Sequence, residues 1–179
     1  MDIHKELVDK CRQGDNRAQY QLYQLYAKAM YNICYRMMNS KEEAEDLLQE
    51  AFVDAFGKLY SFNYESTFGA WLKRIVINNC INELKRKKPE LSYQDDMGRM
   101  EVVDDEEYDE EGIQWEVQRV NNAIENLPEG YRVITSLYLL EGYDHREIAE
   151  IMNISESTSK SQYMRARKKI VEQLKTRAS

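Results

Sequence analysis

An acidic stretch near the middle of the chain limits what this sequence of 179 residues can fold into. Residues 89–113, which begin with Pro89, contain eleven Asp or Glu residues and one Arg, so they carry a formal charge of −10. They include few apolar residues and cannot bury enough surface to offset the entropy lost on ordering. We therefore predict a flexible acidic linker over residues 89–113, fixed in one conformation only by a partner. It separates two domains, residues 1–88 and residues 114–179.

Both domains are predicted to be helical, which makes the fold class all-α. Gly and Pro are scarce, with seven and two in the chain, and apolar residues recur at helical spacing. The net charge of the whole chain is −7, so the residues outside the linker carry +3. The three cysteines lack the spacing of a zinc site and indicate buried free thiols in a reducing cytoplasm. No signal peptide is recognisable, and no apolar run approaches the ~20 residues of a membrane span.

The sequence from Tyr143 onward predicts two helices joined by a tight turn. Asp144 and Glu147 have the spacing of a capping box, which marks a helix N-terminus. Asn153 tolerates the left-handed conformation that ends a helix, and Ser155 then caps a second helix that can run to about Lys175. This arrangement is a helix-turn-helix.

The second helix separates its residues onto two faces. One face is predicted to pack on the first helix and comprises Ser159, Tyr163, Ala166 and Ile170. The opposite face and its flanks carry hydroxyl and cationic groups, which can reach base edges and phosphates in a major groove: Ser157, Thr158, Lys160, Ser161, Met164, Arg165, Arg167 and Lys168. A solvated helix whose late cations complement its dipole would show a similar pattern. The capped partner helix and the tight turn favour DNA binding.

Two long helices are predicted in the first domain. Residues 16–38 hold an apolar stripe of Ala18, Leu22, Leu25, Tyr26, Ala29, Ile33 and Met37. Ser40 and Glu43 form a predicted capping box that opens a helix to about residue 57. One face of that helix is acidic with a single apolar residue and comprises Asp46, Gln49, Glu50 and Val53. Such a face is commonly just solvated, but as a partner surface it suits a basic helix.

Residues 58–87 combine aromatic, amide and cationic side chains, as surfaces for single-stranded nucleic acid do. Loop aromatics such as Phe62 and Tyr64 can stack on unpaired bases or plug the loop onto the core. The next helix carries Phe68, Trp71 and Ile75, followed by Asn78, Asn79 and Asn82. These amides can pair with a base edge or satisfy neighbouring polar groups, and both interpretations stay open. Cations flank them at Lys73, Arg74, Lys85, Arg86, Lys87 and Lys88.

Two further helices are predicted to support the helix-turn-helix. The first carries Trp115, Val117, Val120, Ile124 and Leu127, and Pro128 marks the start of the second. The second carries Tyr131, Ile134, Leu137, Tyr138 and Leu140 and ends at Gly142.

Taken in order, several of these segments resemble an extracytoplasmic-function (ECF, group 4) sigma factor of bacterial RNA polymerase, in the sigma-70 family. The resemblance covers about Gly14 to Leu174, apart from the linker. It rests on Gly14-Asp15, AEDLLQEAF at 44–52, FGAWLKRIVINNCINELKRK from Phe68, LPEGYR from Leu127 and TSKSQYMRARKK from Thr158. The resemblance implies two helical domains, region 2 at 1–88 and region 4 at 114–179.

The resemblance also implies partners and sites. Region 2 would bind the β′ clamp helices of core polymerase through Asp46, Gln49, Glu50 and Val53. It would open and read the promoter −10 element, with a flipped base held between loop and helix, through Phe62, Tyr64, Phe68, Trp71, Lys73, Arg74, Asn78, Asn82, Lys85 and Arg86. Region 4 would contact the β flap and read the −35 element through Ser157, Thr158, Lys160, Ser161, Met164, Arg165 and Lys168. Promoter DNA and an anti-sigma factor are the other expected partners.

The sequence departs from the family pattern at two positions of the last helix. Ser159 stands where a core valine is usual, and Gln162 replaces a cation, so the −35 sequence cannot be borrowed from another member. We expect no enzymatic activity, cofactor or metal, because His4 and His145 lack partners for catalysis or metal binding. Two rival hypotheses remain at this stage. One is an autonomous helix-turn-helix regulator, and the other is a helical adaptor that touches no DNA.

Overall fold

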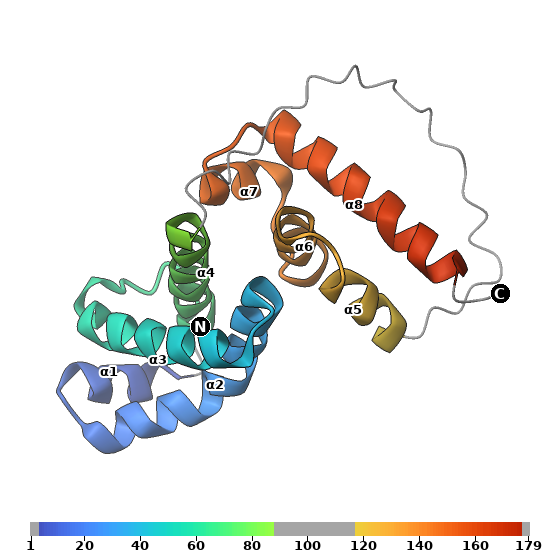
Figure 1. Cartoon of the computed structure of the whole chain (residues 1–179). Helices are drawn as coiled ribbons and strands as arrows, with labels where there is room; N and C mark the ends of the chain where they lie inside the picture. The colour runs from blue at the N-terminus through green and yellow to red at the C-terminus, as the bar shows by residue number, and fades with distance from the viewer. Residues whose placement is uncertain (1–3, 88–116, 177–179) are drawn as a thin grey trace. The chain divides into compact units, whose positions relative to one another are not determined.

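The computed structural model describes residues 4–87 and 117–176, and every regular element within these ranges is helical (Figure 1). The all-α prediction is therefore confirmed. The chain divides into two compact units, unit 1 at residues 1–88 and unit 2 at residues 89–179. The predicted linker, residues 89–113, lies outside the described residues.

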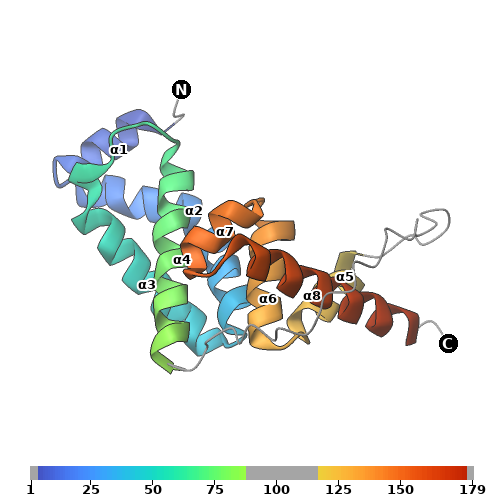
Figure 2. The same ribbon diagram turned by 90° about the horizontal axis from the view of Figure 1, so that it is seen from above.

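Unit 1 is built on three long helices. Its elements are α1 (Lys5–Arg12), α2 (Asn16–Met38), α3 (Lys41–Gly57), the short 3₁₀ turn η1 (Leu59–Ser61) and α4 (Phe68–Lys87). The helices α2, α3 and α4 pack against one another, and α1 packs on α2 (Figure 2). The three cysteines are buried free thiols, as predicted, and burial raises the pKa of Cys11 to about 11.

The buried face of α2 differs at its edge from the predicted stripe. Leu25 is 54% exposed and Ala29 is also exposed, so the prediction was wrong at these two positions. Met30 and Cys34 are buried instead. The other helices of unit 1 pack against the side of α2 that carries Leu22, Met30 and Cys34. Leu25 and Ala29 lie beside that side and are therefore exposed to solvent.

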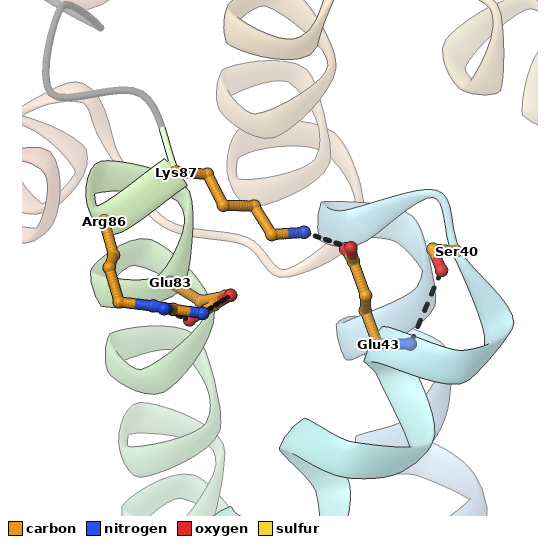
Figure 3. Close-up of polar contacts among 5 residues, drawn as sticks. All are labelled: Ser40, Glu43, Glu83, Arg86 and Lys87. Atoms are coloured by element: carbon orange, nitrogen blue, oxygen red, sulfur yellow. Dashed lines mark hydrogen bonds and ion pairs between the residues drawn. The ribbon is translucent and has the colours of Figure 1, made fainter.

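The N-terminus of α3 shows half of its predicted capping box. Ser40 Oγ accepts a hydrogen bond from the Glu43 backbone N–H at 3.4 Å. The carboxylate of Glu43 does not complete the box, because it pairs with Lys87 at the end of α4 (Figure 3). A tertiary ion pair thus replaces the local contact predicted from spacing.

Unit 2 is organised around its last helix. Its described elements are α5 (Val117–Glu125), α6 (Glu129–Thr135), the π-helical turn η2 (Ser136–Leu140), α7 (His145–Met152) and α8 (Glu156–Thr176). The helix α8 packs against α5, α6 and α7. The α5–α8 core comprises Ala123, Ile124, Leu127, Ala166, Ile170 and Leu174. Within the described ranges, no helix is long and apolar enough to cross a membrane.

The π-helical turn changes which residues of the second supporting helix are buried. Glu141 N–H bonds to Ser136 O at 3.0 Å, five residues back, so one residue more than in an α-helix fits into the turn. Leu137 is fully buried as predicted. Leu140 is 40% exposed, so its predicted place in the core was wrong. Gly142, with φ 76°, follows in a conformation that favours glycine. Val117 is 76% exposed and likewise does not join the core.

Candidate nucleic-acid interface

The acidic face of α3 points into solvent. Its opposite face buries Ala44, Leu47, Leu48, Ala51, Phe52 and Ala55 in the core of unit 1. Asp46, Gln49 and Glu50 are exposed, and Val53 is 72% exposed beside them. Within the part of the chain that the structure describes, none of the three polar side chains makes an ion pair or hydrogen bond. The structure therefore leaves an acidic surface with one exposed apolar residue at its end open to a partner.

The loop between α3 and α4 packs part of its aromatic cluster onto the core of unit 1. Phe62 is 2% exposed and Phe68 is fully buried, which is the second of the two arrangements left open for the loop aromatics. Phe62 packs on Phe68 and Trp71 at centroid distances of 5.9 and 5.2 Å. Tyr64 and Trp71 remain half-buried at the surface of this cluster, while Tyr60 is 84% exposed. Phe62 therefore contacts both half-buried rings, Tyr64 and Trp71, and Phe68 contacts Trp71 as well.

The three asparagines of α4 have two different roles. Asn79 donates a hydrogen bond from Nδ2 to Asp54 Oδ2 on α3 at 3.0 Å, so its amide satisfies a neighbouring polar group. Asn78 and Asn82 are exposed, and neither side chain has a hydrogen-bond partner among the described residues. They follow Trp71 at helical spacing on the accessible side of α4. An aromatic ring and two free amides therefore share one strip of surface.

Cations border this strip, and part of their charge is paired within unit 1. Lys73 and Arg74 are half-buried and Lys85 is exposed. Arg86 donates to both carboxylate oxygens of Glu83 at 2.8 and 2.7 Å, which lowers the pKa of Glu83, and Lys87 pairs with Glu43 (Figure 3). Exposed ion pairs of this kind are weak, so a phosphate can compete for the same cations.

The helix-turn-helix of unit 2 forms as its caps predicted. Asp144 accepts from the Glu147 N–H at 2.8 Å, and the Glu147 carboxylate accepts from the Asp144 N–H at 2.9 Å. Asn153 ends α7 with φ 56°, and Ser155 Oγ accepts from the Thr158 N–H at 3.0 Å to start α8. The turn between the two helices is therefore fixed by local hydrogen bonds.

Most of the predicted groove face of α8 is accessible. Ser157, Lys160, Met164 and Lys168 are exposed, and Ser161 and Arg165 are half-buried. Lys160 pairs with Glu156 at 2.6 Å, and Ser161 Oγ donates to the Thr158 carbonyl at 3.0 Å.

Thr158 is the exception on that face. Its side chain is 7% exposed, and its hydroxyl lies 2.7 Å from Ser155 Oγ within the cap. The Thr158 hydroxyl therefore takes part in the cap that starts α8.

A partly buried contact between α7 and α8 was missed by sequence reasoning. Ser159 is fully buried, and its Oγ lies 2.9 Å from Nδ1 of His145. The His145 ring stacks on Tyr138 at 4.5 Å and also contacts Tyr163. Burial and then the charge of Lys160 lower the pKa of His145. The unusual serine at 159 was the available signal, because a hydroxyl in a core position needs a partner.

The described residues offer three surfaces for binding. Among residues 4–87 and 117–176, no group of three His, Cys, Asp or Glu side chains could hold a metal ion. His145 uses Nδ1 in the contact with Ser159. Unit 1 presents the acidic face of α3 and the Trp71–Asn82 strip of α4, and unit 2 presents the groove face of α8.

Two family models match the chain, one in each unit. Residues 22–90 match Sigma-70 region 2, and residues 118–170 match Sigma-70, region 4. The chain is 30% identical to the ECF RNA polymerase sigma factor SigW of Bacillus subtilis, with 96% of each chain covered. It is 31% identical to SigM of the same organism, over 84% of this chain and 91% of the relative.

Solved structures include a similar fold. The sigma factor RpoE of Bartonella quintana, in its co-crystal structure with the anti-sigma factor NepR, matches with a TM-score of 0.57. The two sequences are 25% identical, and the match covers 87% of this chain and 96% of the other.

Proposed function

The chain belongs to the extracytoplasmic-function sigma factors of the sigma-70 family, and we propose that it binds core RNA polymerase through unit 1 and promoter DNA through both units. It is a sigma factor that directs promoter-specific transcription initiation. The observation that carries this conclusion is the presence of both sigma regions in one chain, together with a relative aligned over 96% of both sequences. Its assignment to group 4 of the family is part of the proposal.

The proposed polymerase surface is the acidic face of α3. Asp46, Gln49 and Glu50 have no partner among the described residues, and Val53 adds exposed apolar area one turn further along the same face. Interfaces of this kind combine a desolvated apolar contact with charges that match those of the partner. The β′ clamp helices of core polymerase are the proposed partner, and unit 2 is proposed to contact the β flap.

The proposed −10 surface is the strip along α4 with the adjoining loop. Trp71 and Tyr64 offer ring faces to unpaired bases, and Asn78 and Asn82 offer free amides. The flanking cations face the DNA backbone: Lys73, Arg74, Lys85 and Arg86. Phe62 and Phe68 are proposed to support this surface from below, because both are buried.

The proposed −35 surface is the groove face of α8. Arg165 and Lys160 can reach base edges, Ser157, Ser161 and Met164 line the contact, and Lys168 faces a phosphate. Thr158 is proposed to act only through the helix cap. Because the whole chain has a net charge of −7, the free protein should bind DNA weakly and gain affinity from polymerase.

The remaining partners and properties follow from family membership. The relative solved with an anti-sigma factor supports an anti-sigma partner for this chain as well. We assign residues 1–88 to region 2, 89–113 to an acidic linker and 114–179 to region 4. The protein is proposed to act in the cytoplasm, where the polymerase is, and to catalyse no reaction itself.

A binding experiment with core polymerase tests the α3 assignment. Replacing Asp46, Gln49 and Glu50 together by alanine should weaken core binding at least ~30-fold, as expected for the centre of an interface. Glu6→Ala, which removes an acid from a different helix, is the control and should bind normally. Core affinity that is unchanged in the triple variant would contradict the surface assignment. A wild-type protein that binds no core polymerase, yet occupies duplex DNA alone, would instead favour an autonomous regulator.

A further inference from the structure

The N-terminal helix α1 contacts the loop of the proposed −10 surface at several points. This helix precedes the residues matched by the region 2 model, which begin at residue 22. Arg12, at the end of α1, donates from Nε to the Leu59 carbonyl at 3.2 Å and from Nη2 to the Phe62 carbonyl. The two carbonyls lie at the two ends of the turn η1. One guanidinium group therefore fixes the backbone on both sides of that turn.

Tyr64 is held by the same helix. Its hydroxyl donates to Asp9 Oδ1 at 2.5 Å, and the cations of Arg12 and Lys5 each lie over its ring, at 4.9 and 5.4 Å from the ring centroid. Asp9 also pairs with Arg12 at 3.6 Å. These contacts join α1 to a residue more than fifty positions away in the sequence.

The backbone of Tyr64 needs such support. Its φ of 62° lies in the left-handed region, which is unfavourable for a bulky residue. Such a conformation persists only where surrounding contacts offset its free-energy cost. Asn and Gly adopt this conformation readily, but tyrosine does not. A strained residue in a loop that is anchored by another helix is typical of a loop held ready for a ligand.

The anchored loop connects directly to the proposed base-binding strip. The Phe62 carbonyl accepts from Arg12, and the Phe62 ring packs under Trp71 at 5.2 Å and beside Tyr64 at 4.7 Å. Displacing the loop backbone would therefore move the ring that supports both accessible aromatics. Preorganisation of this kind increases both affinity and selectivity, because less order must be imposed on binding.

We propose that Arg12 and Asp9 of α1 are positioning residues for −10 recognition, which hold residues 58–67 and Tyr64 in the conformation that accepts an unpaired base. This inference rests on the proposed −10 surface. It adds to that surface the helix α1, which precedes the residues matched by the Sigma-70 region 2 model. Arg12 acts through the loop and does not contact the DNA.

The first test measures the loop in the free, full-length protein. In Arg12→Ala, hydrogen exchange of the amides in residues 58–67 should accelerate about tenfold, because hydrogen bonds from a charged donor are lost. Arg12→Lys should behave nearly the same, since its single ammonium nitrogen lacks the planar fork whose separate Nε and Nη2 atoms reach the two carbonyls. Arg17→Ala is the matched control, since it removes an exposed arginine from the same unit. Loop exchange that is unchanged in Arg12→Ala would overturn the proposal.

The second test measures promoter selectivity with core polymerase present. Arg12→Ala and Arg12→Lys should each lower discrimination between the cognate −10 element and single-base variants about tenfold, with discrimination at −35 and core affinity unchanged. Normal −10 discrimination in Arg12→Lys would indicate a phosphate contact and overturn the inference. A parallel loss of core affinity would indicate a general folding defect and overturn it too. If the wild-type protein itself failed to distinguish −10 variants, the proposed −10 surface would be contradicted, whatever result the Arg12 variants gave.

Discussion

Replacing Ser159 by alanine is expected to loosen the packing of α7 on α8 without unfolding unit 2. Ser159 is fully buried, and its hydroxyl lies 2.9 Å from His145 Nδ1. Alanine removes that hydrogen bond and leaves a half-buried ring nitrogen without its partner, which together cost about 1–2 kcal/mol. This loss corresponds to a factor of about 5–30 in the ratio of folded to unfolded protein. Unit 2 should therefore stay folded but open more often.

The assay is hydrogen exchange of the slowest amides of α7 and α8 in the full-length chain. Their protection should fall by the same factor of about 5–30, while amides of α3 in unit 1 serve as an internal reference. Ser157→Ala is the matched control, because it makes the same change at an exposed position of α8. It should not reduce protection.

Repeating the substitution in a His145→Phe variant separates the free energy of the hydrogen bond from the effect of simply losing a buried hydroxyl. His145→Phe keeps an aromatic ring beside Tyr138 but cannot bond to Ser159. In that background Ser159→Ala should cost at least ~1 kcal/mol less than in the wild-type protein, because the hydroxyl has already lost its partner. Equal costs in the two backgrounds would refute the reasoning. So would Ser159→Ala with wild-type protection.

Three further predictions follow from the proposed surfaces and their charges. Arg165→Ala should cost ~1–3 kcal/mol of binding free energy at the one base pair that Arg165 is proposed to read. Lys168→Ala should weaken −35 binding equally for all sequences and reduce the slope of log affinity against log salt concentration by about 1. Affinities for a set of −35 variants at several salt concentrations test both. Burial lowers the pKa of His145 below its ordinary 6.5, so the unfolded chain takes up the proton first on acidification, and unit 2 should lose stability as the pH falls below about 6.5. Thermal unfolding at a series of pH values should show this slope in the wild type but not in His145→Phe. Glu43→Gln should cost no more than ~1 kcal/mol in urea unfolding, because both side chains of its pair with Lys87 are partly exposed; a larger loss would show that this pair is structurally essential.

Features set by neighbouring residues in the sequence could be predicted well. The capping box of Asp144 and Glu147, the left-handed Asn153 and the start of α8 at Ser155 all depend on contacts within four residues. The two faces of α8 follow from helical spacing, and Ala166 is buried as expected. Short-range hydrogen bonds and helical periodicity depend only on residues that are close together in the sequence, so the sequence alone is enough to predict them.

Features decided by tertiary partners could not be predicted. The carboxylate of Glu43 had a local partner by spacing but pairs with Lys87, which lies 44 residues away. Phe62 was expected either to stack on a base or to plug the core, and only the positions of Phe68 and Trp71 decide that it is buried. Arg12 gave no local signal, because its partners are backbone carbonyls about fifty residues later. The loop of residues 58–67 is therefore the part of the candidate site that could be predicted least well from the sequence.

Promoter-specific transcription is the most direct measurement of the central claim. Purified protein and core RNA polymerase would be incubated with promoter fragments, and the starts of run-off transcripts would be mapped. The account predicts defined starts that require the protein and disappear when either the −10 or the −35 element is altered. Core polymerase that gives the same transcripts with and without the protein, while the protein alone protects duplex DNA, would contradict it.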